Sequence, residues 1–157
     1  YVHHPEFIAK PYMEDELIVV APGDSHYKPG QEISIREFRQ QSFLLREHGS
    51  GTRETFDNVI HAAGFSVDPI WEAMSTTALV NAVINGLGIS VLPYRMIIHP
   101  IQQGLIIPIQ VHGLEFKRKF QIIYHKDKFL TSSALSFIDL CQDYERLYSL
   151  PVYNGLY

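Results

Sequence analysis

Residues 46–53 have the residue types that bind a small anion. They spell R-E-H-G-S-G-T-R, between an apolar stretch typical of a strand and a stretch with helical periodicity. Backbone N–H groups at a helix start point outward, and the helix dipole adds roughly half a positive charge there. Glycines let a ligand approach the backbone, hydroxyls donate, and guanidinium groups pair with carboxylate, sulfate or phosphate. We therefore expect ligand contacts from Arg46, Gly49, Ser50, Gly51, Thr52 and Arg53. A simpler interpretation stays open, in which Ser50 only caps the helix and the glycines relieve a tight turn.

A second candidate segment, Ser75, Thr76 and Thr77, also lies between a predicted strand and a predicted helix. Capping of that helix by Ser75 or Thr76 is an equally good interpretation for any one of these residues. If the sheet is parallel, both segments lie at its carboxyl edge, where open α/β sheets bind ligands. Pro93, which ends a further predicted strand, is assigned to the same ligand-binding site.

No catalytic residue, metal site or cofactor is predicted. Ser50 is not in a G-x-S-x-G elbow, because His48 and Thr52 stand where that motif needs glycines. The eight histidines show no HExxH or paired Cys/His spacing, and the single cysteine, Cys141, lies on an apolar helix face as a small hydrophobic residue does.

Composition sets limits on the function classes. The chain has 157 residues, of which 46% are apolar, and a net charge of -4, which fits a globular domain without a basic surface for DNA. No apolar run approaches the about 20 residues needed to span a bilayer, so no membrane contact is expected. One cysteine excludes an internal disulfide and favours a cytoplasmic location. Because the chain starts at Tyr1 without a signal-like segment, we expect a processed product or a fragment.

Around these segments, strand and helix patterns alternate. Alternation of this kind predicts an α/β fold with a mainly parallel sheet covered on both faces. Ser34 is expected to cap a short helix, with Glu37 completing a capping box. Predicted strands cover residues 17–21, 43–46, 67–74, 89–92, 105–111 and 120–125, and predicted helices cover 35–40, 52–63, a segment from Ser75 to Gly86, and 132–147.

The ordered set of motifs resembles the effector-binding domain of LysR-type transcriptional regulators. The matching strings are D-E-L-I-V-V-A-P at residues 15–22, I-x-x-F at 35–38, G-S-G-T-R at 49–53, M-S-T-T-A-L-V-N-A-V at 74–83 and G-L-G-I-S-V-L-P at 86–93. Each string alone is weak, whereas their order and spacing are fairly specific.

The resemblance implies a type II periplasmic-binding-protein-like fold with two α/β lobes, two crossover strands and an effector in the cleft between the lobes. It implies that residues 17–108 form a complete second lobe. Residues 1–16 and 109–157 would form a partial first lobe with the crossover strands and the C-terminal helix. The family's winged helix-turn-helix is absent from this chain, so DNA would be contacted only through that missing N-terminal domain.

The predicted function is non-catalytic sensing of a small, anionic metabolite. The alternative is a solute-binding protein of an ABC transporter with a phosphate-like ligand, because R-E-x-G-S-G-T also resembles that group.

The last predicted helix has an apolar side that we expect to be buried, formed by Leu135, Ile138, Leu140, Cys141, Tyr144 and Leu147. An incomplete first lobe would nevertheless leave apolar surface on residues 120–124 and 132–147. Since such surface tends to be covered by another chain, a homodimer or higher oligomer is expected.

Overall fold

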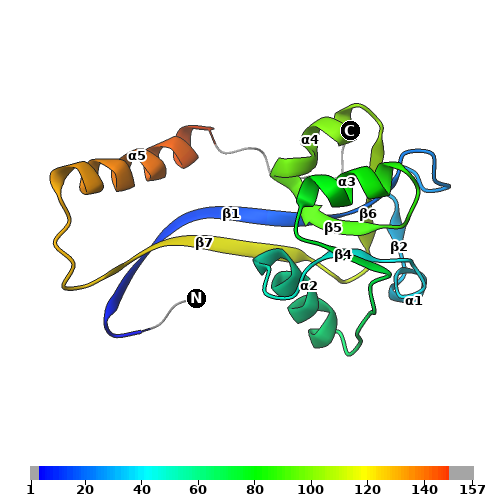
Figure 1. The fold of residues 1–157 in the computed structure, drawn as a ribbon, viewed down its shortest axis with the longest axis horizontal. Helices are drawn as coiled ribbons and strands as arrows, with labels where there is room; N and C mark the ends of the chain where they lie inside the picture. The colour runs from blue at the N-terminus through cyan, green and yellow to red at the C-terminus, as the bar shows by residue number, and fades with distance from the viewer. Residues whose placement is uncertain (1–3, 149–157) are drawn as a thin grey trace. The chain divides into compact units, whose positions relative to one another are not determined.

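The computed structural model describes residues 4–148 and contains two compact units (Figure 1). Of the described residues, unit 1 contains those up to Asp15 and those from Arg118 on, and unit 2 contains Glu16–Lys117. Two strands, β1 (Phe7–Pro22) and β7 (Phe116–His125), each contribute residues to both units. No helix among these described residues is long and apolar enough to cross a membrane.

The sheet of unit 2 has one strand that runs against the others. Its order is β2 (Glu32–Ile33), β6 (Ile106–Val111), β1 and β5 (Ser90–Pro93), and β7 also pairs with β1. β1 is antiparallel to both β5 and β6, whereas β2 is parallel to β6.

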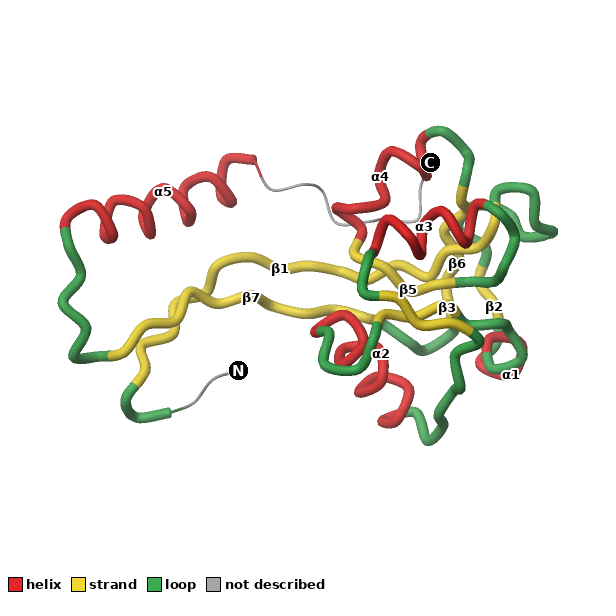
Figure 2. The backbone as a smooth tube through the Cα atoms, viewed as in Figure 1, coloured by secondary structure: helices red, strands yellow, loops and turns green. Residues whose placement is uncertain are grey.

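A parallel strand pair extends this sheet. β3 (Leu44–Arg46) pairs in parallel with β4 (Trp71–Ala73), and a parallel bridge between Phe43 and Ile89 joins β3 to the start of β5 (Figure 2). Strands β2 to β6 therefore share one direction and only β1 opposes them, which confirms a mainly parallel sheet.

Alternation along β1 places apolar side chains on both faces of the sheet. Leu17, Val19 and Ala21 join one buried cluster, whereas Ile18 and Val20 join the other. The first cluster contains a group of aromatic rings with centroids 5.0 to 6.5 Å apart: Phe38, Phe43, Phe56 and Phe116. Helices α1 (Ile35–Phe38) and α2 (Gly51–Ala62) supply two of these rings, and the second cluster is covered by α3 (Thr76–Ile84) and α4 (Tyr94–Gln102). Both faces are thus covered by helices, as the alternating pattern predicted.

The residues that the sequence marks as helix ends do lie at helix ends in the structure. The Oγ atom of Ser34 accepts a hydrogen bond from the Glu37 N–H at 3.2 Å, which is half of the predicted capping box. Gly64 follows α2 with a φ of 82°, a conformation that favours glycine after a helix. On α3, Leu79, Ala82 and Val83 are buried, whereas Leu87 is exposed beyond the end of the helix.

Several elements differ from the prediction. β1 begins at Phe7 and not at residue 17, and β7 begins at Phe116 and not at residue 120. The strand expected at 67–74 is only Trp71–Ala73, and both β2 and α4 were not predicted. β2 is too short for an alternation pattern to show. α4 contains Pro100, a residue that usually interrupts a helix because it has no backbone N–H to donate.

Gly88 is required by a close approach between backbones. A Cβ atom at this position would lie 2.2 Å from the carbonyl oxygen of Ser42. That same oxygen accepts the N–H of Ile89 at 2.9 Å, and the carbonyl of Ile89 accepts the N–H of Leu44 at 2.9 Å. Gly88 thereby permits the bridge that joins β3 to the rest of the sheet.

Unit 1 buries little of its apolar surface. In α5 (Ser132–Tyr148), Ile138 is buried and Cys141 is half-buried, and Gln142 donates a hydrogen bond to the Pro11 carbonyl at 3.2 Å. The prediction that Leu135, Leu140 and Tyr144 are buried is wrong, because they are exposed, and the side chain of Leu147 lies outside the described ones.

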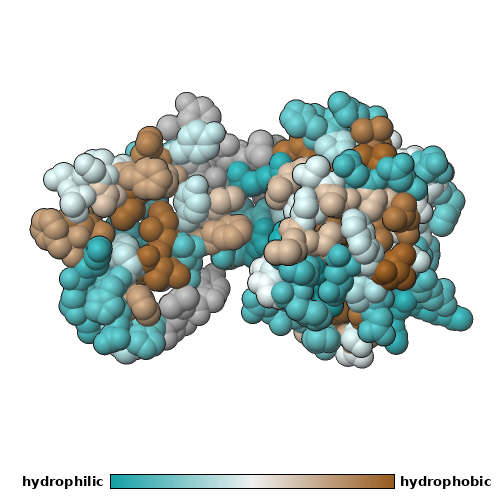
Figure 3. All heavy atoms as spheres, in the orientation of Figure 1, coloured by the Kyte–Doolittle hydropathy of each residue, from teal (hydrophilic) through white to brown (hydrophobic). Residues whose placement is uncertain are grey.

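The reason is geometric. A single helix lying on a pair of strands can bury only one stripe of its surface, and among the described residues of unit 1 no second layer covers the other stripe. Phe120 and Ile123 of β7 are also exposed, as predicted for residues 120–124. Figure 3 shows hydrophobic side chains over this part of the molecule.

Candidate functional site

Three neighbouring strands of unit 2 end at the same edge of the sheet, and a helix follows each of them. Because β3, β4 and β5 are parallel, their carboxyl ends at Arg46, Ala73 and Pro93 lie at one edge. Helix α2 follows β3, α3 follows β4, and α4 begins directly after Pro93. The expectation that residues 46–53 and 75–77 lie at the same edge of the sheet is confirmed. These two segments are called the first and the second loop below.

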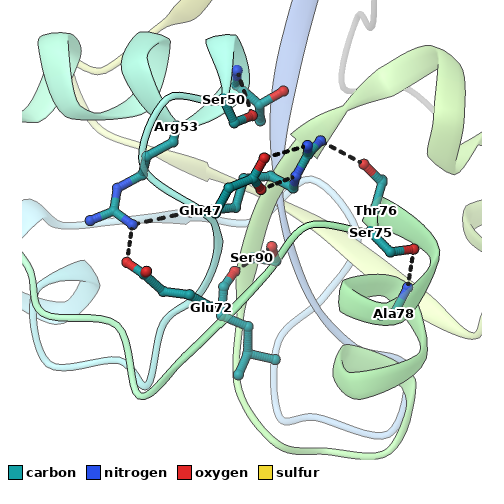
Figure 4. Close-up of polar contacts among 11 residues, drawn as sticks. Glu47, Ser50, Arg53, Glu72, Ser75, Thr76, Ala78 and Ser90 are labelled. Carbon is teal, nitrogen blue, oxygen red and sulfur yellow. Dashed lines mark hydrogen bonds and ion pairs between the residues drawn. The ribbon is translucent and has the colours of Figure 1, made fainter.

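Both predicted capping interactions are present. Ser50 Oγ accepts the N–H of Thr52 at 3.3 Å, and Ser75 Oγ accepts the N–H of Ala78 at 3.3 Å (Figure 4). A cap of this kind satisfies only part of the first helical turn, whose other N–H groups have no intrahelical carbonyl to bond. Capping and ligand binding are therefore compatible at these loops.

The glycines of the first loop leave its backbone accessible. Gly49 has a φ of 92°, a backbone conformation that residues with a side chain rarely adopt. A Cβ atom on either Gly49 or Gly51 would meet no other atom within 4 Å, so the space beside the backbone is open. Around them, Ser50, Thr52 and Thr76 are buried, whereas Ser75 and Thr77 are exposed. Pro93 is buried and pairs with Leu17 of β1.

Arg46 connects the two loops. Its Nη1 donates to Thr76 Oγ1 at 3.3 Å, across from β3 to the start of α3. Its Nε and Nη2 donate to the two carboxylate oxygens of Glu47, at 2.8 and 3.1 Å. Hydrogen bonding from Arg46 lowers the pKa of the Glu47 carboxyl below its usual range. Arg46 is thus directed to the place where the two loops meet.

Arg53 has a different environment. Its side chain is only 6% exposed, and its Nε donates to both carboxylate oxygens of Asp57 at 3.0 and 2.9 Å. Its Nη1 donates to Glu72 at 2.6 Å and to the Arg46 carbonyl at 3.1 Å. Burial alone would lower the pKa of the Arg53 guanidinium, but the hydrogen bonds to Glu72 and Asp57 outweigh it and raise that pKa. Arg53 therefore ties α2 to β3 and β4.

Sequence reasoning missed the carboxylates that hold these arginines. Asp57 lies four residues after Arg53, a spacing that favours a helical ion pair, so it had a local signal. Glu72 had none, because only the β3–β4 pairing brings it to Arg53. A further buried contact, from Ser90 Oγ to the Leu44 carbonyl at 2.6 Å, also depends on the sheet and joins β5 to β3.

The comparisons with known proteins agree on one family. Residues 1–146 match the LysR substrate binding domain. The HTH-type transcriptional regulator YeiE of Escherichia coli K12 is 32% identical over 139 residues, which are 88% of this chain and 47% of that protein. CysL of Bacillus subtilis 168 is 31% identical over 124 residues, covering 79% of this chain and 42% of CysL. The chain thus spans about half the length of these relatives.

Solved structures show the same fold. The CcmR regulatory domain of Synechocystis PCC6803 in complex with 2-PG superposes with a TM-score of 0.81 at 24% identity, over 96% of this chain and 74% of that one. The effector binding domain of QuiR in complex with shikimate gives a TM-score of 0.77 at 19% identity, over 96% and 71%. The predicted type II periplasmic-binding-protein-like fold is confirmed, and these comparisons do not support a transporter's solute-binding protein. The chain belongs to the family of LysR substrate binding domains.

Proposed function

We propose that this chain is the metabolite-sensing domain of a LysR-type transcriptional regulator and that it binds a small anionic effector at the carboxyl edge of the unit 2 sheet. Its relatives are transcriptional regulators, and two structural neighbours are in complex with 2-PG and shikimate. This family regulates transcription and is not enzymatic, so the domain performs no catalysis.

The hydrogen bond between Arg46 and Thr76 carries this proposal. It brings a guanidinium group to a place where two helices begin, so that charge, hydroxyls and backbone N–H groups converge on one small anion. The proposed ligand-binding residues are Arg46, Gly49, Ser50, Gly51, Thr52, Arg53, Ser75, Thr76, Thr77 and Pro93. Among them, Arg53 positions the loop, because its own charge is already balanced by Asp57 and Glu72.

In the proposed mechanism, effector binding shifts the population of the regulator between two states according to the difference in affinity for them. Residues 17–108 are proposed as the second lobe, and residues 1–16 and 109–157 as part of the first. DNA is contacted by a separate winged helix-turn-helix domain, and the protein acts in the cytoplasm.

Removing the Arg46 guanidinium is expected to weaken anion binding about tenfold or more, which matches the loss of a charge-assisted hydrogen-bonded pair. The experiment titrates the ¹⁵N-labelled chain with 2-PG, shikimate and sulfate and follows backbone amide signals. In the native sequence, the signals of residues 49–53 and 75–77 should shift together, and Arg46→Met should suppress these shifts.

Arg36→Met is the matched control, since Arg36 is an exposed arginine on α1. It should bind the same anions with unchanged affinity. Anion-induced shifts that spare both loops would place the effector elsewhere, and shifts that survive Arg46→Met would show that Arg46 does not bind it. Either result would defeat the proposal.

We also propose that the chain forms a homodimer or higher oligomer through α5. Phe137, Leu140 and Tyr144 are 65%, 61% and 58% exposed and recur at a spacing that places them along one side of the helix. Phe137→Ser combined with Leu140→Ser should lower the mass measured by light scattering toward that of a monomer. Asp139→Ser, an exposed change on the same helix, should leave it unchanged. A monomeric mass for the native chain at high concentration would contradict this proposal.

A further inference from the structure

We propose that Glu47 determines the specificity of this site: its carboxylate occupies the recognition edge of Arg46, and a carboxylate of the effector binds Arg46 by displacing it. This inference rests on the proposed function and adds the chemical class of the ligand. The effector would carry a carboxylate, and the competing internal group would set its apparent affinity.

The contact between Arg46 and Glu47 has the form of ligand recognition. Nε and Nη2 of Arg46 donate in parallel to the two oxygens of one carboxylate, at 2.8 and 3.1 Å. A planar fork of donors matches a planar carboxylate in this bidentate manner, whichever molecule supplies it. The remaining Nη1 is directed by Thr76, so the fork itself has a defined orientation.

The Arg46–Glu47 pair is also the one that can open. Glu47 lies in the loop after β3 with its side chain 29% exposed, so it can turn into water without leaving a buried charge. Arg53, by contrast, is buried among two carboxylates and the Arg46 carbonyl. The two guanidinium groups differ in their access to water, because the side chain of Arg46 is 21% exposed and that of Arg53 is 6% exposed. Breaking the pairs of the buried Arg53 would leave an uncompensated charge. A ligand can therefore replace the carboxylate that pairs with Arg46, whereas the carboxylates that pair with Arg53 stay in place.

Displacement has a consequence for selectivity. A displaced Glu47 is still tethered beside Arg46, and its negative charge repels additional charge on the ligand. A monoanionic carboxylate consequently suffers less repulsion than a tetrahedral dianion does. Glu47 thus favours carboxylates by shape and disfavours dianions by charge.

The test compares glycolate, a monoanionic carboxylate, with sulfate, a tetrahedral dianion, on the full 157-residue chain. Glu47→Gln should tighten glycolate binding about fivefold, because the ligand no longer competes with an internal carboxylate for Arg46. The same change should tighten sulfate binding by a larger factor, so the ratio of the glycolate affinity to the sulfate affinity should fall. The side-chain Nε–H signal of Arg46 should move on glycolate addition, which reports exchange at the guanidinium itself.

Glu54→Gln is the matched control, because Glu54 is an exposed carboxylate in the first turn of α2, the helix that follows the loop of Glu47. It removes the same charge away from the Arg46 fork and should change either affinity less than twofold. Glu47→Ala should reproduce the effect of Glu47→Gln, so a folding defect in one variant leaves the other to decide.

The outcomes separate this inference from the proposed function. If the native chain binds glycolate at residues 49–53 and 75–77 but Glu47→Gln binds it equally or more weakly, Glu47 positions Arg46 and does not compete, and the inference is overturned alone. Stronger binding of sulfate than of glycolate to the native chain overturns the carboxylate assignment. If no anion shifts these loops in any variant, the proposed function and the inference fail together.

Discussion

Gly88→Ala is expected to lower the free energy of unfolding by about 4 kcal/mol. Overpacking costs about 1–3 kcal/mol, and the new Cβ atom would meet a backbone oxygen, that of Ser42, which no side-chain rotation can relieve. Separation of the strands would also weaken the hydrogen bonds between Ile89 and Ser42 and between Leu44 and Ile89, each worth about 1 kcal/mol. Urea unfolding followed by the fluorescence of the single tryptophan, Trp71 on β4, measures this loss.

Gly86→Ala provides the comparison within the same G-L-G string. Gly86 has a φ of 75° and open space around it, so alanine there meets only the backbone penalty of about 1 kcal/mol. Hydrogen exchange adds a local measurement: the amide protons of Leu44 and Ile89 should exchange faster in Gly88→Ala and not in Gly86→Ala. Equal destabilisation by the two changes would show that the approach to Ser42 is not what requires Gly88.

Arg53→Met is expected to destabilise unit 2 by about 3 kcal/mol. Removing one partner of a buried ion pair costs about 3–5 kcal/mol, and the lower value applies because Asp57 and Glu72 remain 24% and 37% exposed and can be hydrated. Methionine keeps most of the volume, so the loss reports the guanidinium. The same Trp71 fluorescence suits this variant, because Trp71 precedes Glu72 on β4.

Two controls show whether the loss of stability comes from the ion pairs of Arg53 with Asp57 and Glu72. Arg36→Met removes an exposed arginine and should change the stability by less than about 0.5 kcal/mol. In a double-mutant cycle, Asp57→Asn should cost much less in the Arg53→Met background than in the native one. Additive effects would mean that the two side chains are not energetically coupled.

Much of the candidate site could be predicted because its signals are local. Ser50 and Ser75 are helix caps next to glycine or threonine, and a cap fixes where a helix begins. The alternation of strands and helices then implied parallel strands, and parallel strands bring both helix starts to one edge. No knowledge of long-range contacts was needed for that step.

The remainder depends on contacts that the sequence does not display. Glu72 reaches Arg53 only through the β3–β4 pairing, and the pattern of residues 17–21 does not show that β1 runs against its neighbours. In α5, by contrast, the sequence pattern predicted burial that the structure does not show. Its apolar pattern predicted burial for Leu140, but burial also needs a second surface, which the described part of unit 1 does not provide.

The antiparallel strand β1 also determines when the domain can fold during synthesis. β1 is made before its partners β5 and β6, because Val19 pairs with Val91 on one side and with Ile109 on the other. Pairing across such sequence distances makes folding slow. On the ribosome, the apolar segment 17–21 must therefore wait in the nascent chain until residues through Ile109 have emerged, a period in which a chaperone could hold it.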